Sequence, residues 1–470
     1  MTAFHELGAA PLSRLVHGRQ ASSREIVAAF LDRIEALNPT YNAVVSLRPR
    51  EQLLREAEAA DAQVAAGSPL GPLHGLPLAV KDLSPTRGLR TTFGSPIYAD
   101  FVPQTDSLLV ERLRAAGALI IGKTNTPEFG LGSQTYNPVF GATRNAFDPS
   151  RTSGGSSGGA AVALALGMVP AADGSDFGGS LRNPAAYNNI FGFRPSQGRV
   201  PSWPAADPYF GQLSTDGPMA RTVEDLALLL EVMAGYDRRA PLSLDPAHPL
   251  FGDLVAPTAP RVGWLGDLGG HLPFENGIIE LCESALKSMD AMGAKVEAIT
   301  PRFDFEELWR TFVVLRQFNQ LARLKPLYED PQKRPLLKPE AIWEVEGGLA
   351  LSAADVSAAI QARGRWYGEV CRLFDTFDVL AIPSAQVFPF AAETTWPRAI
   401  GARAMDSYHR WMEVIVPATL SGCPVISVPV GFREGLPMGM QLIGRPRDDR
   451  ALLAFAKAYE AILPFKTGAL

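Results

Sequence analysis

Short apolar runs alternate with helical periodicities along this chain, and this alternation restricts its fold more than any other feature. Apolar runs at residues 76–80 (LPLAV), 118–121 (ALII) and 425–428 (VISV) have the length of buried strands. Helical patterns lie between them, for example at 107–116 and 159–166. Strands that alternate with helices are typical of an α/β protein. We therefore expect one large domain, with a central mixed, mostly parallel twisted sheet flanked by helices on both faces.

Capping residues mark several helix starts. Ser22 followed by Glu25 forms a capping box, and Asn38-Pro39 should end that helix. Thr222 and Asp225 should cap a further helix. The other helices are expected at residues 51–66, 226–233, 276–292, 305–325 and 353–374.

Composition excludes several function classes. The 470 residues carry a net charge of −5, and no basic run is longer than a pair such as Arg238-Arg239, so we expect no nucleic-acid partner. An apolar stretch of about 18 residues, as a membrane span requires, is missing from the sequence, so we expect no membrane partner. The three cysteines, Cys282, Cys371 and Cys423, form no CxxC pair, which disfavours a zinc or dithiol site and suits a reducing, cytoplasmic location.

Two catalytic motifs occur in the wrong context. Residues 117–124 match the phosphate-loop pattern GxxxxGK[ST], but the strand lies between the glycines instead of before them, and Pro127 follows where a helix is needed. Ser284 and Lys287 match SxxK, and residues 466–468 match KTG, as in penicillin-recognising enzymes. That SxxK lies in an ordinary amphipathic helix, and the KTG almost at the last residue.

A nucleophile elbow is a remote alternative. Gly154-x-Ser156-x-Gly158 fits GxSxG, the motif of Ser-His-Asp hydrolases. An elbow follows a buried strand, whereas polar residues 147–153 precede this one. The base would have to be His248, His271 or His409.

Three separated segments offer a different constellation. Lys81 ends the apolar run at 76–80, where burial would favour its neutral form and let it act as a base. Ser156 lies among four glycines, and Ser180 follows a Gly178-Gly179 pair that leaves backbone N–H groups uncovered, as an oxyanion hole requires. From spacing alone, a catalytic site and three unrelated tight turns around a buried lysine remain equally open.

These segments resemble the amidase signature family. The similar segments are LHGLPLAVKDL (73–83), GLRTTFGSP (88–96), ALIIGKTNTPEFG (118–130), GATRNAFDPSRTSGGSSGGAAVALALG (141–167), DGSDFGGSLRNPAAYNNIFGFRPSQGRVP (173–201), SGCPVISVPVGF (421–432) and GLPMGMQLIGRP (435–446). The resemblance implies a single amidase signature domain over residues 1–470. Its core motifs would occupy 73–235 and 415–446, with a variable substrate-pocket region at about 235–400.

The resemblance also implies roles for individual residues. Ser180 aligns with the acylated nucleophile, Ser156 with a bridging serine that a cis peptide bond precedes, and Lys81 with the base. The backbone N–H groups of the oxyanion hole would be those of Phe177, Gly178, Gly179 and Ser180. Ser157, Asp176 and Arg182 would support these groups from behind. No metal ion or organic cofactor is implied.

The implied activity is that of an amidohydrolase acting on linear amides. Aromatic residues crowd the variable region, and bulky apolar residues of loops 202–213 and 384–390 are expected to line the pocket. This favours a small-molecule apolar or aryl amide, with an ester or a carbamate also open. The alternative within the family is the glutaminase component of a tRNA-dependent amidotransferase, its A subunit. A homodimer stays open.

Overall fold

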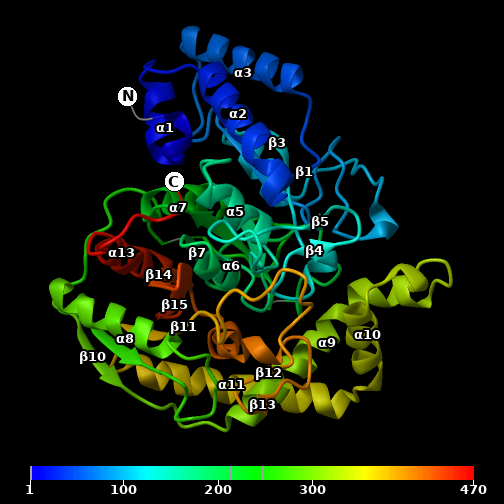
Figure 1. The fold of residues 1–470 in the computed structure, drawn as a ribbon, viewed down its shortest axis with the longest axis vertical. Helices are drawn as coiled ribbons and strands as arrows, with labels where there is room; N and C mark the ends of the chain where they lie inside the picture. Colours follow the sequence, from blue (N-terminus) through cyan, green and yellow to red (C-terminus); the bar gives the residue numbers. More distant parts are fainter. Residues whose placement is uncertain (1–2, 212, 246, 470) are drawn as a thin grey trace.

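The computed structural model describes residues 3–211, 213–245 and 247–469 (Figure 1). Its α-helices are α1 (Ala9–His17), α2 (Ser23–Tyr41), α3 (Arg50–Ala65), α4 (Leu108–Ala115), α5 (Gly158–Ala165), α6 (Arg182–Tyr187), α7 (Val223–Met233), α8 (Ile278–Ser288), α9 (Phe305–Glu329), α10 (Pro339–Ala350), α11 (Ala353–Phe374), α12 (Val416–Ser421) and α13 (Asp449–Glu460). Its strands are β1 (Val44–Val45), β2 (Pro77–Lys81), β3 (Leu119–Thr124), β4 (Tyr136–Asn137), β5 (Gly141–Ala142), β6 (Ala172–Asp176), β7 (Phe191–Arg194), β8 (Thr215–Ala220), β9 (Arg261–Trp264), β10 (Lys295–Ala298), β11 (Val379–Pro383), β12 (Ala399–Ile400), β13 (Arg403–Ala404), β14 (Val425–Arg433) and β15 (Leu436–Gly444).

The central sheet has eight strands in the order β10-β9-β11-β15-β14-β7-β8-β6. The predicted α/β class and the mixed sheet are confirmed. Parallel pairing is less extensive than expected, however: β10, β9 and β11 run parallel, whereas the ladders from β11 through β15 to β6 are antiparallel. A second sheet, β1-β3-β2, pairs β2 parallel to β3.

A tight hairpin explains much of the antiparallel pairing. Strands β14 and β15 are joined at Glu434-Gly435, where both residues have positive φ, 51° and 79°. Two left-handed residues in succession form the turn whose twist matches an antiparallel hairpin. The apolar run at 425–428 predicts the first of these strands, but the sequence pattern does not reveal the turn that follows it.

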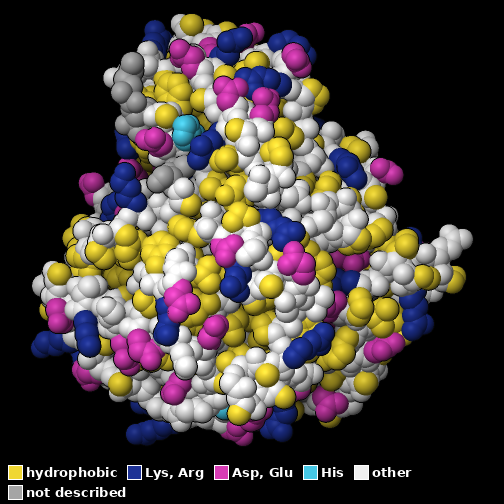
Figure 2. Space-filling model, viewed as in Figure 1, with side chains coloured by type: hydrophobic (Ala, Val, Ile, Leu, Met, Phe, Trp, Pro, Cys, Tyr) yellow, Lys and Arg dark blue, Asp and Glu magenta, His cyan; other side chains and the backbone are white. Residues whose placement is uncertain are grey.

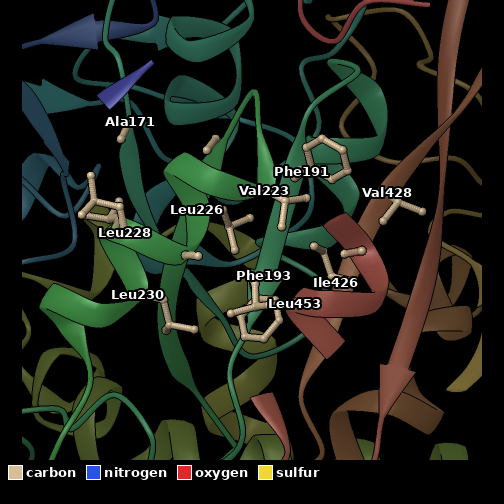
Figure 3. Packing of buried hydrophobic residues seen from close by; sticks show 14 of the residues in the cluster. Ala171, Phe191, Phe193, Val223, Leu226, Leu228, Leu230, Ile426, Val428 and Leu453 are labelled. Atoms are coloured by element: carbon tan, nitrogen blue, oxygen red, sulfur yellow. The ribbon is translucent and has the colours of Figure 1, made fainter. Parts of the chain in front are cut away.

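Helices cover both faces of the central sheet, as predicted. Side chains on β15 alternate, so Met438, Met440 and Leu442 face the core that α7, α8 and α13 complete. On the opposite face Gln441 accepts a hydrogen bond from Arg182 of α6. Figure 3 shows part of this core, in which the following side chains converge: Phe191 and Phe193 of β7, Ile426 and Val428 of β14, Leu226 of α7 and Leu453 of α13.

Most helices lie near their predicted ranges. The Ser22–Glu25 capping box is present, and Thr222 caps α7. The expected stop at Asn38-Pro39 is wrong, because Pro39 lies in the last turn and α2 continues to Tyr41. Helix α10 was not predicted; it packs beside α9, on the right-hand side of the view in Figure 1.

Charged side chains of both signs are interspersed on the face that Figure 2 shows. Within the described residues, the helices lack the combination of length and apolarity that crossing a bilayer would need.

Candidate active site

Lys81 ends strand β2 and is buried in the interior. Its backbone N–H donates to Asp173 Oδ1 on β6 at 3.0 Å, which fixes the end of the strand. Its amine lies 2.8 Å from Ser156 Oγ, 2.7 Å from Ser157 Oγ and 3.0 Å from Ser175 Oγ. The structure thus brings together two of the three residues that the spacing singled out.

The peptide bond between Gly155 and Ser156 is cis, as the family resemblance implies. Hydroxyl groups hold the loop around it: Ser133 Oγ donates to the Gly155 carbonyl at 2.7 Å, and Thr135 Oγ1 donates to the Gly154 carbonyl at 2.8 Å. Ser157 then leads into helix α5. The glycines of α5 allow close packing, since a Cβ on Gly159 would lie 2.3 Å from the Asn125 nitrogen.

Ser180 lies in the turn between β6 and α6. It is 7% exposed and lines the same cavity as Ser156. Its hydroxyl has no hydrogen-bond partner among the described residues, so it faces the cavity unengaged. The chain reaches this position through Gly179, whose φ of +87° a residue with a side chain rarely adopts.

Three of the four expected oxyanion donors remain available. In the described part of the chain, the N–H groups of Phe177, Gly178 and Ser180 have no partner. The expectation for Gly179 is wrong, because its N–H donates to Asp176 Oδ1 at 2.8 Å and is not free to face the cavity.

Asp176 and Arg182 brace this turn from behind. Asp176 also accepts from the Leu181 N–H at 3.1 Å, and both its oxygens lie 2.9 Å from the Arg182 guanidinium. Burial would raise the pKa of Asp176, but Arg182 and Arg194 outweigh it and hold that pKa well below its usual value. A charged, doubly anchored carboxylate therefore fixes the backbone of the turn that carries Ser180.

Burial lowers the pKa of Lys81 to about 7, although Asp173, Asp216 and Asp176 each act to raise it. The carboxylate of Asp82, the next residue, accepts from the Thr92 backbone and hydroxyl and so points away from the amine. The three aspartates on β6 and β8 act on the amine but do not undo the effect of burial.

Asp173, Ser175 and Asp216 belong to the site and were missed. Ser175 pairs directly with Asp216 across β6 and β8, so their side chains share one face, and both residues line the cavity. Burial, reinforced by Asp173, raises the pKa of Asp216 to about 7. Period-two alternation from Asp173 to Ser175 was the available signal; the pairing with residue 216 is not visible in sequence.

The cavity has a volume of about 550 Å³. Its apolar lining comes in part from the expected 202–213 loop, through Trp203 and its neighbours, together with Leu109, Phe129, Phe318 and Met412. Residues 384–390 do not line it, because Ala385 and Phe388 belong to the core of the central sheet instead. Trp309, Phe312 and Trp366 are core residues as well.

The histidines stand apart from Ser156. His248 is exposed, and His271 bonds to Glu413 at 2.8 Å. His409 is buried among aromatic rings with Nδ1 2.9 Å from Ser407 Oγ, and burial lowers its pKa well below the usual value. The arrangement therefore gives no geometric support to a Ser-His-Asp site at Ser156.

His271, Glu306 and Glu413 approach one another closely enough to be considered as metal ligands. Arg410 and Arg403 already pair with these carboxylates, at 2.5 Å and 3.0 Å from Glu306. The charge of this group is thus balanced within the protein.

Comparison with known proteins gives a consistent result. The family model described as Amidase matches residues 25–453. An acylamidase from Rhodococcus erythropolis is 34% identical over 472 residues, covering 98% of this chain and 96% of that protein. The A subunit of the glutamyl-tRNA(Gln) amidotransferase from Synechococcus sp. (strain CC9605) is 36% identical over 469 residues, covering 94% and 93%. The crystal structure of a bacterial aryl acylamidase of the amidase signature family superposes with a TM-score of 0.90 at 31% identity, covering 97% and 96% of the two chains.

Proposed function

Because this chain belongs to the amidase signature family and is an amidohydrolase, we propose that it cleaves an apolar or aryl amide through Lys81, Ser156 and Ser180. One observation carries the proposal: the buried Lys81 amine contacts Ser156 in a cavity into which the unengaged Ser180 hydroxyl opens. The relay needs a neutral amine, and burial lowers the pKa of Lys81 to about 7.

The proposed reaction begins with proton transfer. Neutral Lys81 takes a proton from Ser156, which takes one from Ser180 as its Oγ attacks the amide carbonyl. The N–H groups of Phe177, Gly178 and Ser180 stabilise the developing oxyanion. The relay then runs backwards and protonates the leaving amine, which departs. Water repeats the cycle on the acyl-enzyme and releases the acid.

The cavity lining supports an aryl or apolar substrate. A volume of about 550 Å³ suits a small organic molecule. Trp203, Phe129 and Phe318 provide apolar surface on its walls. An acylamidase and an aryl acylamidase among the similar proteins point the same way. A panel of anilides, aliphatic amides, carbamates and glutamine, compared by kcat/KM, tests this assignment.

Similarity to the A subunits of amidotransferases supports a second candidate. In that role the same site would release ammonia from glutamine for a partner protein. Glutamine as the preferred substrate, or co-purification with such a partner, would replace the free-hydrolase assignment.

We expect Asp216→Asn to shift the acidic limb of the kcat/KM profile to lower pH. The Asp216 carboxylate raises the pKa of Lys81, so its removal lets the amine lose its proton more readily. The expected shift is up to about 0.5 pH unit, less than a full charge would give, because Asp216, whose own pKa is about 7, is only partly ionised at the midpoint. Asp207→Asn is the matched control, because Asp207 also lines the cavity but its carboxylate accepts from the backbone N–H groups of Tyr209 and Phe210. If the midpoint of the acidic limb in Asp216→Asn stayed in place or moved to higher pH, the proposed coupling between Asp216 and Lys81 would be contradicted.

A further inference from the structure

One wall of the cavity is polar, which the proposed chemistry does not require. Helix α9 presents Arg316, Asn319, Gln320 and Arg323 to the cavity. These residues follow the spacing i, i+3, i+4 and i+7, so they share one face of the helix. The same helix also lines the cavity with Phe318 and Leu321, so polar and apolar groups lie side by side on this wall.

The two arginines of this wall differ in how their charges are balanced. Arg316 is buried, its Nε lies 2.5 Å from Glu344 Oε1, and its Nη2 donates to the Tyr408 hydroxyl at 2.8 Å. Arg323 forms no ion pair with any described residue. Its Nη2 donates to neutral acceptors, the Phe129 carbonyl at 2.8 Å and Gln320 Oε1 at 3.0 Å.

Arg323 is therefore a cation without an ion pair among the described residues, and it lies on the wall of the cavity that Ser156 and Ser180 also line. Arg323 is exposed to solvent where it lines the cavity, and the Glu344 carboxylate, which pairs with Arg316, also acts on it electrostatically. A carboxylate that reaches this guanidinium from the cavity can form charge-assisted hydrogen bonds with it. Gln320 extends the same site, because its amide oxygen is engaged by Arg323 while its NH2 group has no partner among the described residues.

The site lies close to the proposed relay. The Phe129 carbonyl that Arg323 contacts precedes Gly130, and a Cβ on Gly130 would lie 3.4 Å from Ser156 Oγ. The acidic groups of the cavity lie elsewhere: Asp216 acts on Lys81, and Asp207 accepts from two backbone N–H groups. An anionic substituent is thus drawn towards α9 and away from β8.

We propose that Arg323, assisted by Gln320, binds a carboxylate on the substrate, so that the enzyme prefers amides that carry one negative charge. This inference rests on the proposed function and narrows its substrate class to carboxylated aryl or apolar amides. The planar guanidinium suits the two oxygens of a carboxylate.

Two matched substrate pairs test the inference and locate the carboxylate. The first pair compares 4-acetamidobenzoate with neutral 4-acetamidotoluene, and its charge is on the amine side of the amide. The second pair compares succinanilate with neutral butyranilide, and its charge is on the acyl side. We expect wild type to prefer the charged member of one pair. Arg323→Gln should lower kcat/KM for that member about 30-fold, the effect of losing a hydrogen-bonded charge, and change the neutral member little.

Arg323→Lys should retain most of the preference, because it keeps the charge. Lys325→Gln is the matched control: Lys325 is a cation on the same helix that pairs with Glu329 at 3.4 Å and does not line the cavity. It should leave the preference unchanged. An equal loss on both members of a pair, or no preference in either pair, overturns the inference.

A binding measurement separates this inference from the proposed function. Calorimetric titration of the Ser180→Ala protein with 4-acetamidobenzoate and with succinanilate needs no turnover. If either compound binds and Arg323→Gln weakens that binding, the carboxylate site is supported even if neither amide is hydrolysed. In that case only the proposed hydrolysis of aryl amides fails. Absence of binding for both overturns the site.

Discussion

Replacing Ser180 with alanine is expected to lower amide hydrolysis by about 10⁴- to 10⁶-fold, on the order found when a serine nucleophile is removed. The reason is chemical, because no other hydroxyl in the cavity lies on the turn that offers the N–H groups of Phe177 and Gly178. Steady-state kinetics on an anilide measures the loss. A fluorophosphonate probe should label wild type and not the variant, and mass spectrometry should locate the adduct on Ser180.

Ser202→Ala is the matched control, since Ser202 also lines the cavity but lies outside the proposed relay. It should keep its activity and its labelling. An adduct on Ser156 in wild type would contradict the assignment and favour a nucleophile elbow instead.

Replacing Lys81 with methionine should slow acylation by several orders of magnitude and also flatten the acidic limb of kcat/KM. Because burial lowers the pKa of Lys81 to about 7, its amine is protonated and inactive below this pH, and activity in wild type should rise as pH passes through about 7. The variant has no amine left to titrate there. Pre-steady-state acylation rates measured from about pH 5 to 9 give both quantities.

Lys123→Met provides the control for burying a methionine in place of a lysine. Lys123 is also buried, pairs with Val80 across β2 and β3, and donates to the Ser84 carbonyl and Thr86 hydroxyl. Its loss should affect stability but leave the midpoint of the pH profile in place. If Lys81→Met kept the wild-type profile at reduced height, another group would be the base.

The starts of some helices could be predicted from the sequence, because their capping residues lie within one turn of each other. Ser22 and Glu25 cap each other within one turn, and Ser352 with Asp355 does the same at the start of α11. Strand order could not be predicted in this way, because the pairing of β7 with β14 depends on contacts between residues far apart in the chain. The hairpin at Glu434-Gly435 was missed because glutamate is an uncommon choice for a left-handed turn position.

The site was predictable only in part for the same reason. Lys81, Ser156 and Ser180 lie in glycine-rich or apolar segments whose composition is distinctive. Asp216 and Arg323 lie in segments without such a signature, and they reach the cavity through sheet pairing and helix packing. The occupied Gly179 N–H could not be foreseen either, since its partner is a side chain whose direction depends on Arg182.

The buried amine of Lys81 also has a consequence for the acid–base stability of the whole fold. Its pKa falls from 10.5 in the unfolded chain to about 7 in the folded protein, so the unfolded state holds an extra proton between these values. Folding stability therefore rises with pH across that window, by roughly 5 kcal/mol in total.

The raised pKa of Asp216 has the opposite effect on folding stability, at pH values below about 7. Its pKa rises from 3.8 to about 7, so its contribution to stability is complete below pH 3.8 and is lost as pH rises towards 7. The two windows meet near pH 7, where these groups together stabilise the fold least. Lys81→Met should abolish the alkaline half of this profile, which urea unfolding at about pH 6 and about pH 9 would reveal. The fold is thus least stabilised by these two groups near pH 7, where Lys81, the proposed base, exchanges its proton.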